Sequence, residues 1–226
     1  MPRPAQPRPV LVGVAGLLVL AAATACTPLG TSAGARSTVA APSASADTSA
    51  QSAGSLAVGP GPQATYTVAV QPPPGSCRYR YANGQPLPDP ACTPGAVSPA
   101  VTQANLDSTI CRKGGYTASV RPPVAVTDAE KRASAAAYGY AGSLHDAEYD
   151  HLVPLSAGGD PNDPRNLWLE APSPDHRPQD GFANPKDDVE DRIHEAICSR
   201  RVPLAEAQRA VAENWATALA ALGLAE

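Results

Sequence analysis

A long stretch of small and polar residues near the N-terminus most constrains what this chain can fold into. Residues 27–64 are dominated by Ala, Ser, Gly, Thr and Pro, and only Arg36 and Asp47 are charged. Such a segment buries too little apolar surface to offset the entropy lost on ordering, so we expect a disordered tether. The folded part then begins near residue 65 and has about 160 residues, enough for one modest core.

The segment before this tether has the organisation of an export signal. Arg3 and Arg8 precede an uncharged apolar run over residues 10–25, which is short for a membrane span. The run ends in Ala23-Thr24-Ala25-Cys26, which resembles a bacterial lipobox, whose cysteine is lipidated. An ordinary cleaved signal peptide is the alternative. We therefore expect residues 1–26 to direct export, with Cys26 anchoring the protein to the membrane outside the cytoplasm, or a secreted protein if the lipobox assignment fails.

Four further cysteines favour disulfides in an oxidising compartment. Cys77, Cys92, Cys111 and Cys198 allow three pairings, and sequence alone does not choose among them. Cys77 and Cys92 bracket one short segment, which favours Cys77–Cys92 with Cys111–Cys198. A zinc site is the competing use, but the chain has no Cys-x-x-Cys pair to support it.

The folded region divides by pattern into a small β subdomain, residues 65–99, and a larger domain, residues 100–226. In the first, residues 65–70 alternate as a strand does, and residues 78–84 predict a strand entering a tight Asn-Gly turn. In the second, Thr127 to Glu130 is a capping box, which predicts a helix to about residue 138. Together these patterns predict an α+β fold.

The C-terminal half reads as strand, glycine-broken loop, strand and helix. Residues 148–155 and 166–170 are the expected strands, separated by Gly158-Gly159. Asn184-Pro185 is typical of a helix start, with Asn as the N-cap. Val189, Ile193 and Ile197 lie four residues apart and are expected to face the core. A last helix is predicted from Pro203, with an apolar stripe of Leu204, Ala207, Val211, Trp215 and Leu219.

This order, with its polar residues, resembles the ββα-metal finger of HNH endonucleases. The resemblance is carried by Asp150-His151-Leu152-Val153-Pro154-Leu155, Gly158-Gly159 and Asn166-Leu167, and it extends over about residues 102–219. The segment around Lys186-Asp187, Glu190, His194 and Cys198 is similar to exported HNH-like proteins of actinobacteria. It implies an HNH-type nuclease that hydrolyses phosphodiester bonds of DNA, and we expect a monomer with no protein partner.

The resemblance also implies roles for three residues. His151 would be the general base, Asn166 would hold the His151 ring, and Asp150 would bind a divalent cation. Neighbours on a strand point to opposite sides, so Asp150 can face a metal while His151 faces a water. One carboxylate with waters favours Mg²⁺ or Mn²⁺, and additional imidazole ligands would favour Zn²⁺ or Ni²⁺.

The remaining metal ligand is less well defined. Asn184 is the candidate at the start of the helix, but an Asn before Pro is equally an N-cap. Asp187, or Asp188 beside it, and His176 in the preceding loop are alternatives. Lys186 is a candidate for binding the substrate phosphate, with a salt bridge to Asp187 or Glu190 as the alternative.

Other polar and aromatic residues have simpler interpretations. Surface or packing roles are expected for His145 and His194, and core positions for Trp168 and Trp215. Two loop arginines, Arg165 and Arg177, are expected to be solvated unless they bind a phosphate.

The charge of the larger domain favours a second function class. From Ser98 onward there are 12 Lys and Arg against 19 Asp and Glu, which leaves a net charge of −7. DNA-binding proteins usually carry a basic surface instead. The alternative function is therefore a non-catalytic envelope module that uses the finger as a scaffold.

Overall fold

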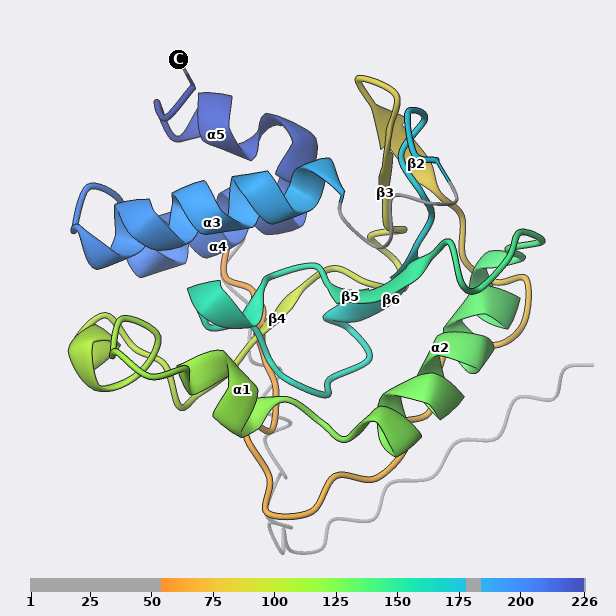
Figure 1. The fold of residues 1–226 in the computed structure, drawn as a ribbon, viewed down its shortest axis with the longest axis horizontal. Coiled ribbons are helices and arrows are strands. Elements are labelled where there is room, and N and C mark those ends of the chain that lie inside the picture. The colour runs from red at the N-terminus through yellow and green to blue at the C-terminus, as the bar shows by residue number, and fades with distance from the viewer. Residues whose placement is uncertain (1–53, 178–183, 226) are drawn as a thin grey trace, which may run out of the picture. The chain divides into compact units, whose positions relative to one another are not determined.

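The computed structural model describes residues 54–177 and 184–225, and the export signal, Cys26 and most of the expected tether lie outside them. The described chain is mixed α and β, with three two-stranded sheets (Figure 1). In chain order the strands are β1 (Ala57–Val58), β2 (Arg80–Ala82), β3 (Gln85–Leu87), β4 (Ala96–Val97), β5 (Glu148–His151) and β6 (Leu167–Glu170). The helices are α1 (Tyr116–Val120), α2 (Val124–Tyr138), α3 (Pro185–Cys198), α4 (Leu204–Asn214) and α5 (Ala218–Ala221).

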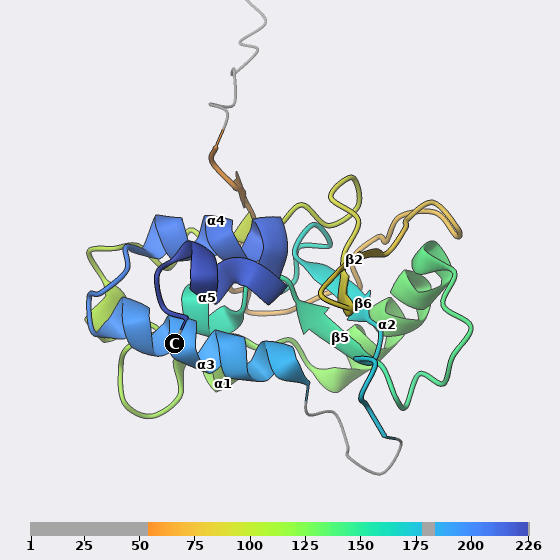
Figure 2. The same cartoon turned by 90° about the horizontal axis from the view of Figure 1, so that it is seen from above.

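The antiparallel β5–β6 hairpin lies between α2 on one side and α3 with α4 on the other (Figure 1; Figure 2). In its register Glu148 is opposite Glu170, and His151 is opposite Leu167. All four residues of β6 are buried because helices cover it. The hairpin therefore supplies the central framework on which the polar residues are placed.

The segment that we expected as a separate β subdomain is part of the same core. Cys77 and Leu87 are buried in one cluster with Trp168, Ile193 and Trp215. The Trp215 indole donates a hydrogen bond to the Pro86 carbonyl at 2.8 Å. The predicted boundary at residues 99 and 100 therefore does not separate two folding units, because the β2–β3 hairpin is too small to bury its own apolar face.

The described fold also begins earlier than the pattern predicted. β1 pairs in parallel with β4, and the Gly59 amide donates to the Val97 carbonyl at 2.9 Å. The Gly61 amide donates to the Asp160 carboxylate at 2.6 Å. The end of the expected 27–64 tether is therefore incorrectly placed, since these backbone hydrogen bonds order a segment whose side chains carry little packing information.

Several elements differ from their predicted bounds. Residues 65–70 form no strand, and α2 begins at Val124 rather than at the capping box of Thr127. β5 ends at His151, after which residues 155–157 form a short 3₁₀ turn. The last predicted helix is divided into α4, a 3₁₀ turn at Trp215 and α5. The predicted apolar positions Ile193 and Ile197 on α3 are fully buried, as expected.

Both expected disulfides are present. Cys77 is bonded to Cys92, and Cys111 is bonded to Cys198. The second bridge ties the C-terminal end of α3 to the segment before α1, across 87 residues of chain. It therefore fixes the helix that follows the β5–β6 hairpin against the N-terminal part of the domain.

Candidate functional site

His151 ends β5 with one ring nitrogen committed to the backbone. The ring is 4% exposed, and its Nε2 lies 3.0 Å from the Pro161 carbonyl. A carbonyl only accepts hydrogen bonds, so Nε2 carries the proton and Nδ1 is the basic nitrogen. Burial lowers the His151 pKa to about 4, against an opposing effect of the Asp150 charge. The imidazole is therefore neutral at pH 7 and held in one tautomer.

Asn166 closes the loop between the two strands rather than contacting the His151 ring. Its Oδ1 accepts from the Val153 amide at 2.9 Å, and its Nδ2 donates to the carbonyls of Val153 and Asp160, each at 3.0 Å. The side chain is fully buried with both polar atoms satisfied. Asn166 thus positions His151 through the backbone at the end of β5.

Gly159 makes this close approach possible. An added Cβ at this position would lie 1.8 Å from the Val153 carbonyl oxygen and 2.8 Å from the Asn166 Nδ2. Any side chain would push the loop away from the strand. Gly159 is thus required by the close packing of the loop against Val153 and Asn166, and Gly158 by its positive φ of 75° in the turn.

Asp150 projects toward α3, where it meets a buried lysine. The Lys186 side chain is 1% exposed, and its Nζ donates to the Asp150 carboxylate at 2.5 Å and to the His151 carbonyl at 2.9 Å. It also forms an ion pair with Glu190, one turn along the helix. The ion pair with Glu190 is the alternative to phosphate binding that the sequence offers for Lys186, whereas the pair with Asp150 was not expected. With three acceptors around a buried ammonium, Lys186 binds the hairpin to α3.

Carboxylates outnumber this ammonium. Glu148, Glu170, Asp187 and Glu190 act electrostatically on the same cluster as Asp150, which places five carboxyl groups around one lysine. Burial first, and then the neighbouring carboxylates, raises the pKa of Glu148 to about 8 and that of Glu190 to about 7. Burial alone would lower the Lys186 pKa, but Asp150 and Glu190 outweigh it and raise that pKa. The cluster has an excess of negative charge that it reduces by binding protons.

Asn184 is the N-cap of α3, which is one of the two roles that the sequence allows for it. Its Oδ1 accepts from the backbone amides of Lys186 and Asp187, at 2.8 and 3.3 Å. The Asp187 carboxylate accepts in return from the Asn184 amide at 3.2 Å. The Asn184 Nδ2 donates to Glu148 at 3.1 Å. The metal-ligand roles expected for Asn184 and Asp187 remain predictions, but both side chains are used in the capping box.

Replacing Asn184 by Ala is expected to cost about 1 kcal/mol of stability, because the capping hydrogen bonds to the first turn of α3 are lost. Denaturant unfolding of the two proteins measures this difference. Asn184→Ser is the matched control, since Ser is as good a cap and adds no charge, but it is too short to bond Glu148. Equal losses in Asn184→Ala and Asn184→Ser would contradict a simple capping role.

Glu170 is the site residue that the sequence analysis did not single out. It is 2% exposed, and no N–H donor among the described residues bonds either carboxylate oxygen. Burial raises the Glu170 pKa well above its usual range, and the Asp150 carboxyl raises it further through its charge and a side-chain hydrogen bond. A signal was present in the register, because Glu148 lies directly opposite it on β5. Like charges in that position repel.

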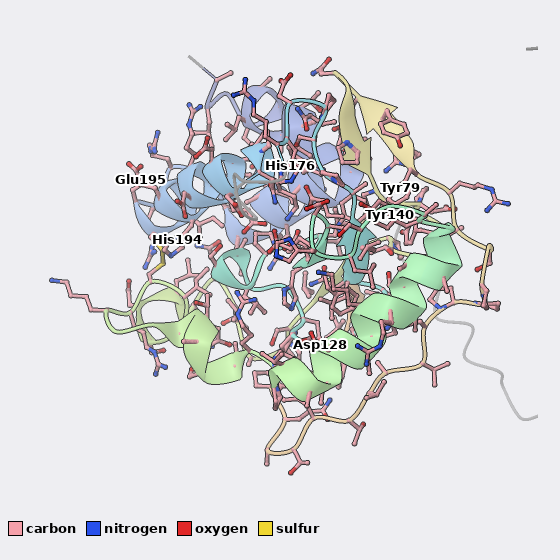
Figure 3. All side chains as sticks on the ribbon, turned by 45° about the vertical axis from the view of Figure 1, so that its right-hand side comes forward. Tyr79, Asp128, Tyr140, His176, His194 and Glu195 are labelled. Atoms are coloured by element: carbon pink, nitrogen blue, oxygen red, sulfur yellow. A yellow bond between two sulfur atoms is a disulfide. The ribbon has the colours of Figure 1, made fainter. Side chains whose placement is uncertain are left out.

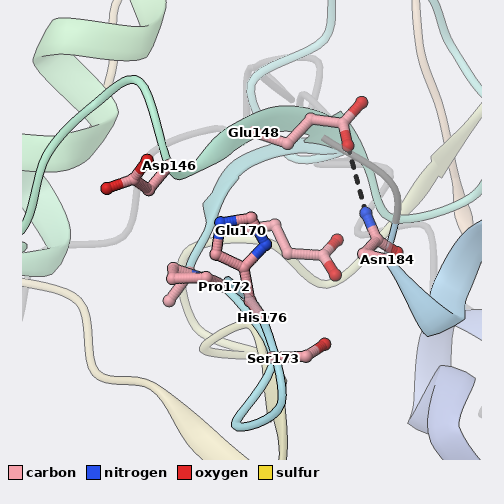
Figure 4. A pocket seen from close by; sticks show the side chains of 8 residues that line it. Asp146, Glu148, Glu170, Pro172, Ser173, His176 and Asn184 are labelled. Carbon is pink, nitrogen blue, oxygen red and sulfur yellow. Dashed lines mark hydrogen bonds between the residues drawn. The ribbon is translucent and has the colours of Figure 1, made fainter. Parts of the chain in front are cut away.

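A small cavity of about 20 Å³ lies beside this pair. Glu148, Glu170, His176 and Asn184 line it, and Figure 4 shows these side chains, with the Glu148 carboxylate bonded to Asn184. The buried Nε2 of His176 has no hydrogen-bond partner among the described residues. This brings His176, one of the alternative ligands expected from the sequence, to the acidic side of the hairpin.

A larger cleft of about 450 Å³ opens on the other side, beside His151. Arg121 precedes α2 and Lys131 lies within it, and both line this cleft with Tyr149 and Glu148. Burial lowers the Lys131 pKa. Asp128 also lines the cleft, which therefore has two basic and two acidic side chains besides His151, and Glu148 borders both the cleft and the small cavity.

The other singled-out residues lie away from this site. His194 on α3 bonds to the Ile110 carbonyl at 3.0 Å, and Figure 3 shows it apart from His176. Arg165 pairs with Asp163 at 2.5 Å, and Trp168 is buried in the core. His145 and Arg177 are exposed and Trp215 is buried, as expected. Asp188, an alternative metal ligand in the sequence analysis, is exposed on α3, and that role stays a prediction.

Within the described residues, Cys111, His194 and Cys198 form a group whose ligand atoms lie within 4.8 Å of one another. Such a Cys-His-Cys group can hold a metal ion when its sulfurs are thiolates. Here the two sulfurs are bonded to each other. The group is therefore a metal site only in reduced protein.

No protein-family model, no curated protein and no solved structure matches this chain. In the described ranges, none of the helices has both the length and the apolar composition to cross a bilayer. The function is therefore argued from the geometry of the β5–β6–α3 unit.

Proposed function

We propose that this protein is a metal-dependent endonuclease of the HNH type that hydrolyses phosphodiester bonds. The observation that carries the proposal is the state of His151. It is a neutral imidazole whose Nε2 is bonded to a carbonyl, at the rim of a cleft and next in sequence to a carboxylate that faces the opposite side. That is the arrangement a general base needs.

In the proposed reaction, the Nδ1 of His151 takes a proton from a water molecule. The water oxygen forms a bond to phosphorus, and the bond from phosphorus to the 3′ oxygen breaks, with solvent supplying the proton to that oxygen. The hydrogen bond from Nε2 to the Pro161 carbonyl keeps the ring oriented and strengthens Nδ1 as a base. Asn166 holds the loop that supplies this carbonyl, through its bond to Asp160.

The acidic side of the hairpin fits a divalent cation. Five carboxyl groups interact with one ammonium, and the buried Glu170 carboxyl lies beside that of Asp150, so the cluster is short of positive charge. Asp150 is the ligand that the resemblance implies, although one of its oxygens already bonds Lys186. A divalent cation held near Glu148, which borders both the acidic side and the cleft beside His151, would stabilise negative charge on a phosphate in that cleft and on the leaving oxygen. Its carboxylate environment favours Mg²⁺ or Mn²⁺.

The cleft beside His151 is the place proposed for the substrate backbone. Arg121 and Lys131 line it, whereas the domain as a whole is acidic. Asp128 and Glu148 line the same cleft, so these two cations support local contact with a phosphate and not tight nonspecific binding of DNA. We propose that DNA is the substrate and that the protein acts as a monomer outside the cytoplasmic membrane. The two disulfides fit an oxidising compartment.

A plasmid-nicking assay with the purified full-length protein tests the function directly. Supercoiled DNA is incubated with Mn²⁺ or Mg²⁺, and a parallel sample contains EDTA. Conversion to open-circle DNA with the metal and none with EDTA is the expected result. A folded protein that leaves the plasmid intact with Mg²⁺, Mn²⁺, Zn²⁺ and Ni²⁺ contradicts the proposal.

One observation favours the alternative of a non-catalytic envelope module. The Lys186 ammonium lies between Asp150 and Glu190, where it already supplies positive charge to the carboxylate that the resemblance assigns to the metal. In that case the cluster would be a structural ion-pair network. A Lys186→Met variant separates the two functions: loss of stability with unchanged metal binding is expected of the scaffold.

A further inference from the structure

The loop that orients the His151 ring is shaped by a buried aspartate. The Pro161 carbonyl accepts from the His151 Nε2 at 3.0 Å, and Asp160 directly precedes Pro161 in the chain. Asp160 is fully buried, and its Oδ1 accepts from the backbone amides of Asn162 at 3.0 Å and Asp163 at 2.9 Å. These two bonds fold the chain around Pro161 into a turn, so the direction of its carbonyl depends on the Asp160 carboxylate.

The second oxygen of this carboxylate is bonded to a distant part of the chain. The Gly61 amide donates to the Asp160 Oδ2 at 2.6 Å, across 99 residues of sequence. The Asp160 backbone is used as well, since its amide donates to the Ala96 carbonyl and its carbonyl accepts from Asn166, each at 3.0 Å. Every polar atom of Asp160 therefore has a partner, which fixes the residue on which the turn depends.

The distant partner belongs to an N-terminal strap, defined as residues 57–71, which Figure 1 shows passing along α2. One backbone amide of the strap donates to the buried Glu130 on α2 at 2.6 Å. On the other side of Pro161, the Asn162 Nδ2 donates to the Thr67 carbonyl in the strap at 3.0 Å. The residues on both sides of Pro161 are thus bonded to the strap.

Gly59 shows how closely the strap packs against the carboxylate. A Cβ added at Gly59 would lie 2.3 Å from the Asp160 Oδ2 and 2.5 Å from its Cγ. The Gly59 amide donates to the Val97 carbonyl at 2.9 Å, so the strap cannot move away at this point without disturbing the β1–β4 pairing. A residue without a side chain is therefore needed here for the Asp160 carboxylate to keep its position.

We propose that Asp160 is a positioning residue for the His151 base and that the strap completes the site by holding Asp160. It acts through the Pro161 carbonyl, which keeps the ring proton on Nε2 and leaves Nδ1 to accept a proton from water. This role rests on the proposed function only for its use in catalysis, since the orientation of the ring involves no DNA. It makes residues 57–61 necessary for the geometry of a site to which they contribute no side chain.

The first test replaces Asp160 by Asn, which has nearly the same shape. Its amide oxygen can still accept from the turn, but its NH₂ group then faces the Gly61 amide, and two donors cannot bond each other. NMR of the ring nitrogens in the full-length oxidised protein, labelled at histidine, shows the tautomer at pH 7, and His151→Gln assigns the signals. We expect the Nε2–H tautomer in the unmodified protein and a shift toward the Nδ1–H tautomer in Asp160→Asn.

The second test, Gly59→Ala, reaches the same carboxylate from the strap. The new Cβ displaces the Asp160 side chain without removing its charge. The same shift of the His151 tautomer is expected. In both variants the nicking rate at saturating DNA should fall by about 10²-fold while KM stays within about twofold, because the base is misplaced and the substrate is not.

Asp163→Asn is the matched control in the same loop. The Asp163 side chain is buried and paired with Arg165 at 2.5 Å, so this substitution costs stability but leaves the Gly61–Asp160 bond in place. The His151 tautomer and the nicking rate should match those of the unmodified protein. Equal changes in Asp163→Asn and Asp160→Asn would mean a general loosening of the loop and would overturn the positioning role.

The NMR and nicking results fail separately. An unchanged His151 tautomer in folded Asp160→Asn and Gly59→Ala overturns the positioning role, and the nuclease proposal stands if the unmodified protein still nicks the plasmid. A changed tautomer in both variants, with an unmodified protein that leaves the plasmid intact, supports the role of Asp160 and contradicts the nuclease. If one variant does not fold, the other decides.

Discussion

Replacing His151 by Gln is expected to lower the rate of plasmid nicking by about 10²–10⁴-fold, the usual contribution of a general base. The Gln side chain can still donate to the Pro161 carbonyl, but it has no basic nitrogen in place of Nδ1. The rate loss should therefore come from the missing base rather than from a displaced loop. Initial rates with saturating Mn²⁺ measure it.

Two controls show whether the rate loss is specific to the His151 base. The Mn²⁺ affinity of His151→Gln should match that of the unmodified protein, since His151 lies on the side of β5 away from the acidic cavity. His145→Ala is the control histidine, because its side chain is largely exposed in the loop before β5. A folded His151→Gln protein that nicks DNA at the unmodified rate would exclude His151 as the base.

Removing the Cys111–Cys198 bridge is expected to cost roughly 4–5 kcal/mol of stability in the chain-entropy model, since the bridge closes an 87-residue span. The double variant Cys111→Ser with Cys198→Ser should also bind Mn²⁺ more weakly. The bridge holds the end of α3, and α3 carries Lys186 and the cap residue that bonds Glu148. Denaturant unfolding and calorimetry give the two quantities.

The Cys77–Cys92 bridge provides the comparison within the same molecule. It spans 15 residues, so its removal is expected to cost about 3 kcal/mol. It lies in the segment before β4, and neither of its cysteines is part of α3 or lines the small cavity beside Glu148 and Glu170. The argument about α3 would be wrong if both double variants lost the same stability and the same Mn²⁺ affinity.

Local patterns were sufficient for much of the framework. The order of hairpin and helix, the cap at Asn184 and the buried positions Ile193 and Ile197 were predicted from short-range signals and are confirmed. Both cysteine pairings are confirmed as well. These features depend on residues within one or two turns of each other, or on a small number of possible combinations, so the sequence constrains them strongly.

The limits of the small elements were not predictable in the same way. The strand expected at residues 65–70 is absent, and β1 forms outside the predicted fold by pairing with β4. A two-residue strand carries almost no sequence signal, because its stability comes from backbone hydrogen bonds to a distant partner. The sequence of residues 65–99 likewise does not show that this segment shares the core of the larger domain, because its short strands are stabilised by distant partners.

For the site, the sequence by itself determined which residues lie along the hairpin and at the start of α3: Asp150, His151, Asn166, Asn184 and Lys186. Only the tertiary structure decided what each of them meets. Lys186 forms ion pairs with Asp150 and Glu190. Glu170 lies opposite Glu148, and His176 lines the small cavity beside these two glutamates. Periodicity specifies which face of an element is apolar, but the pairing of buried charges depends on strand register and helix placement, which the packing of the whole core fixes.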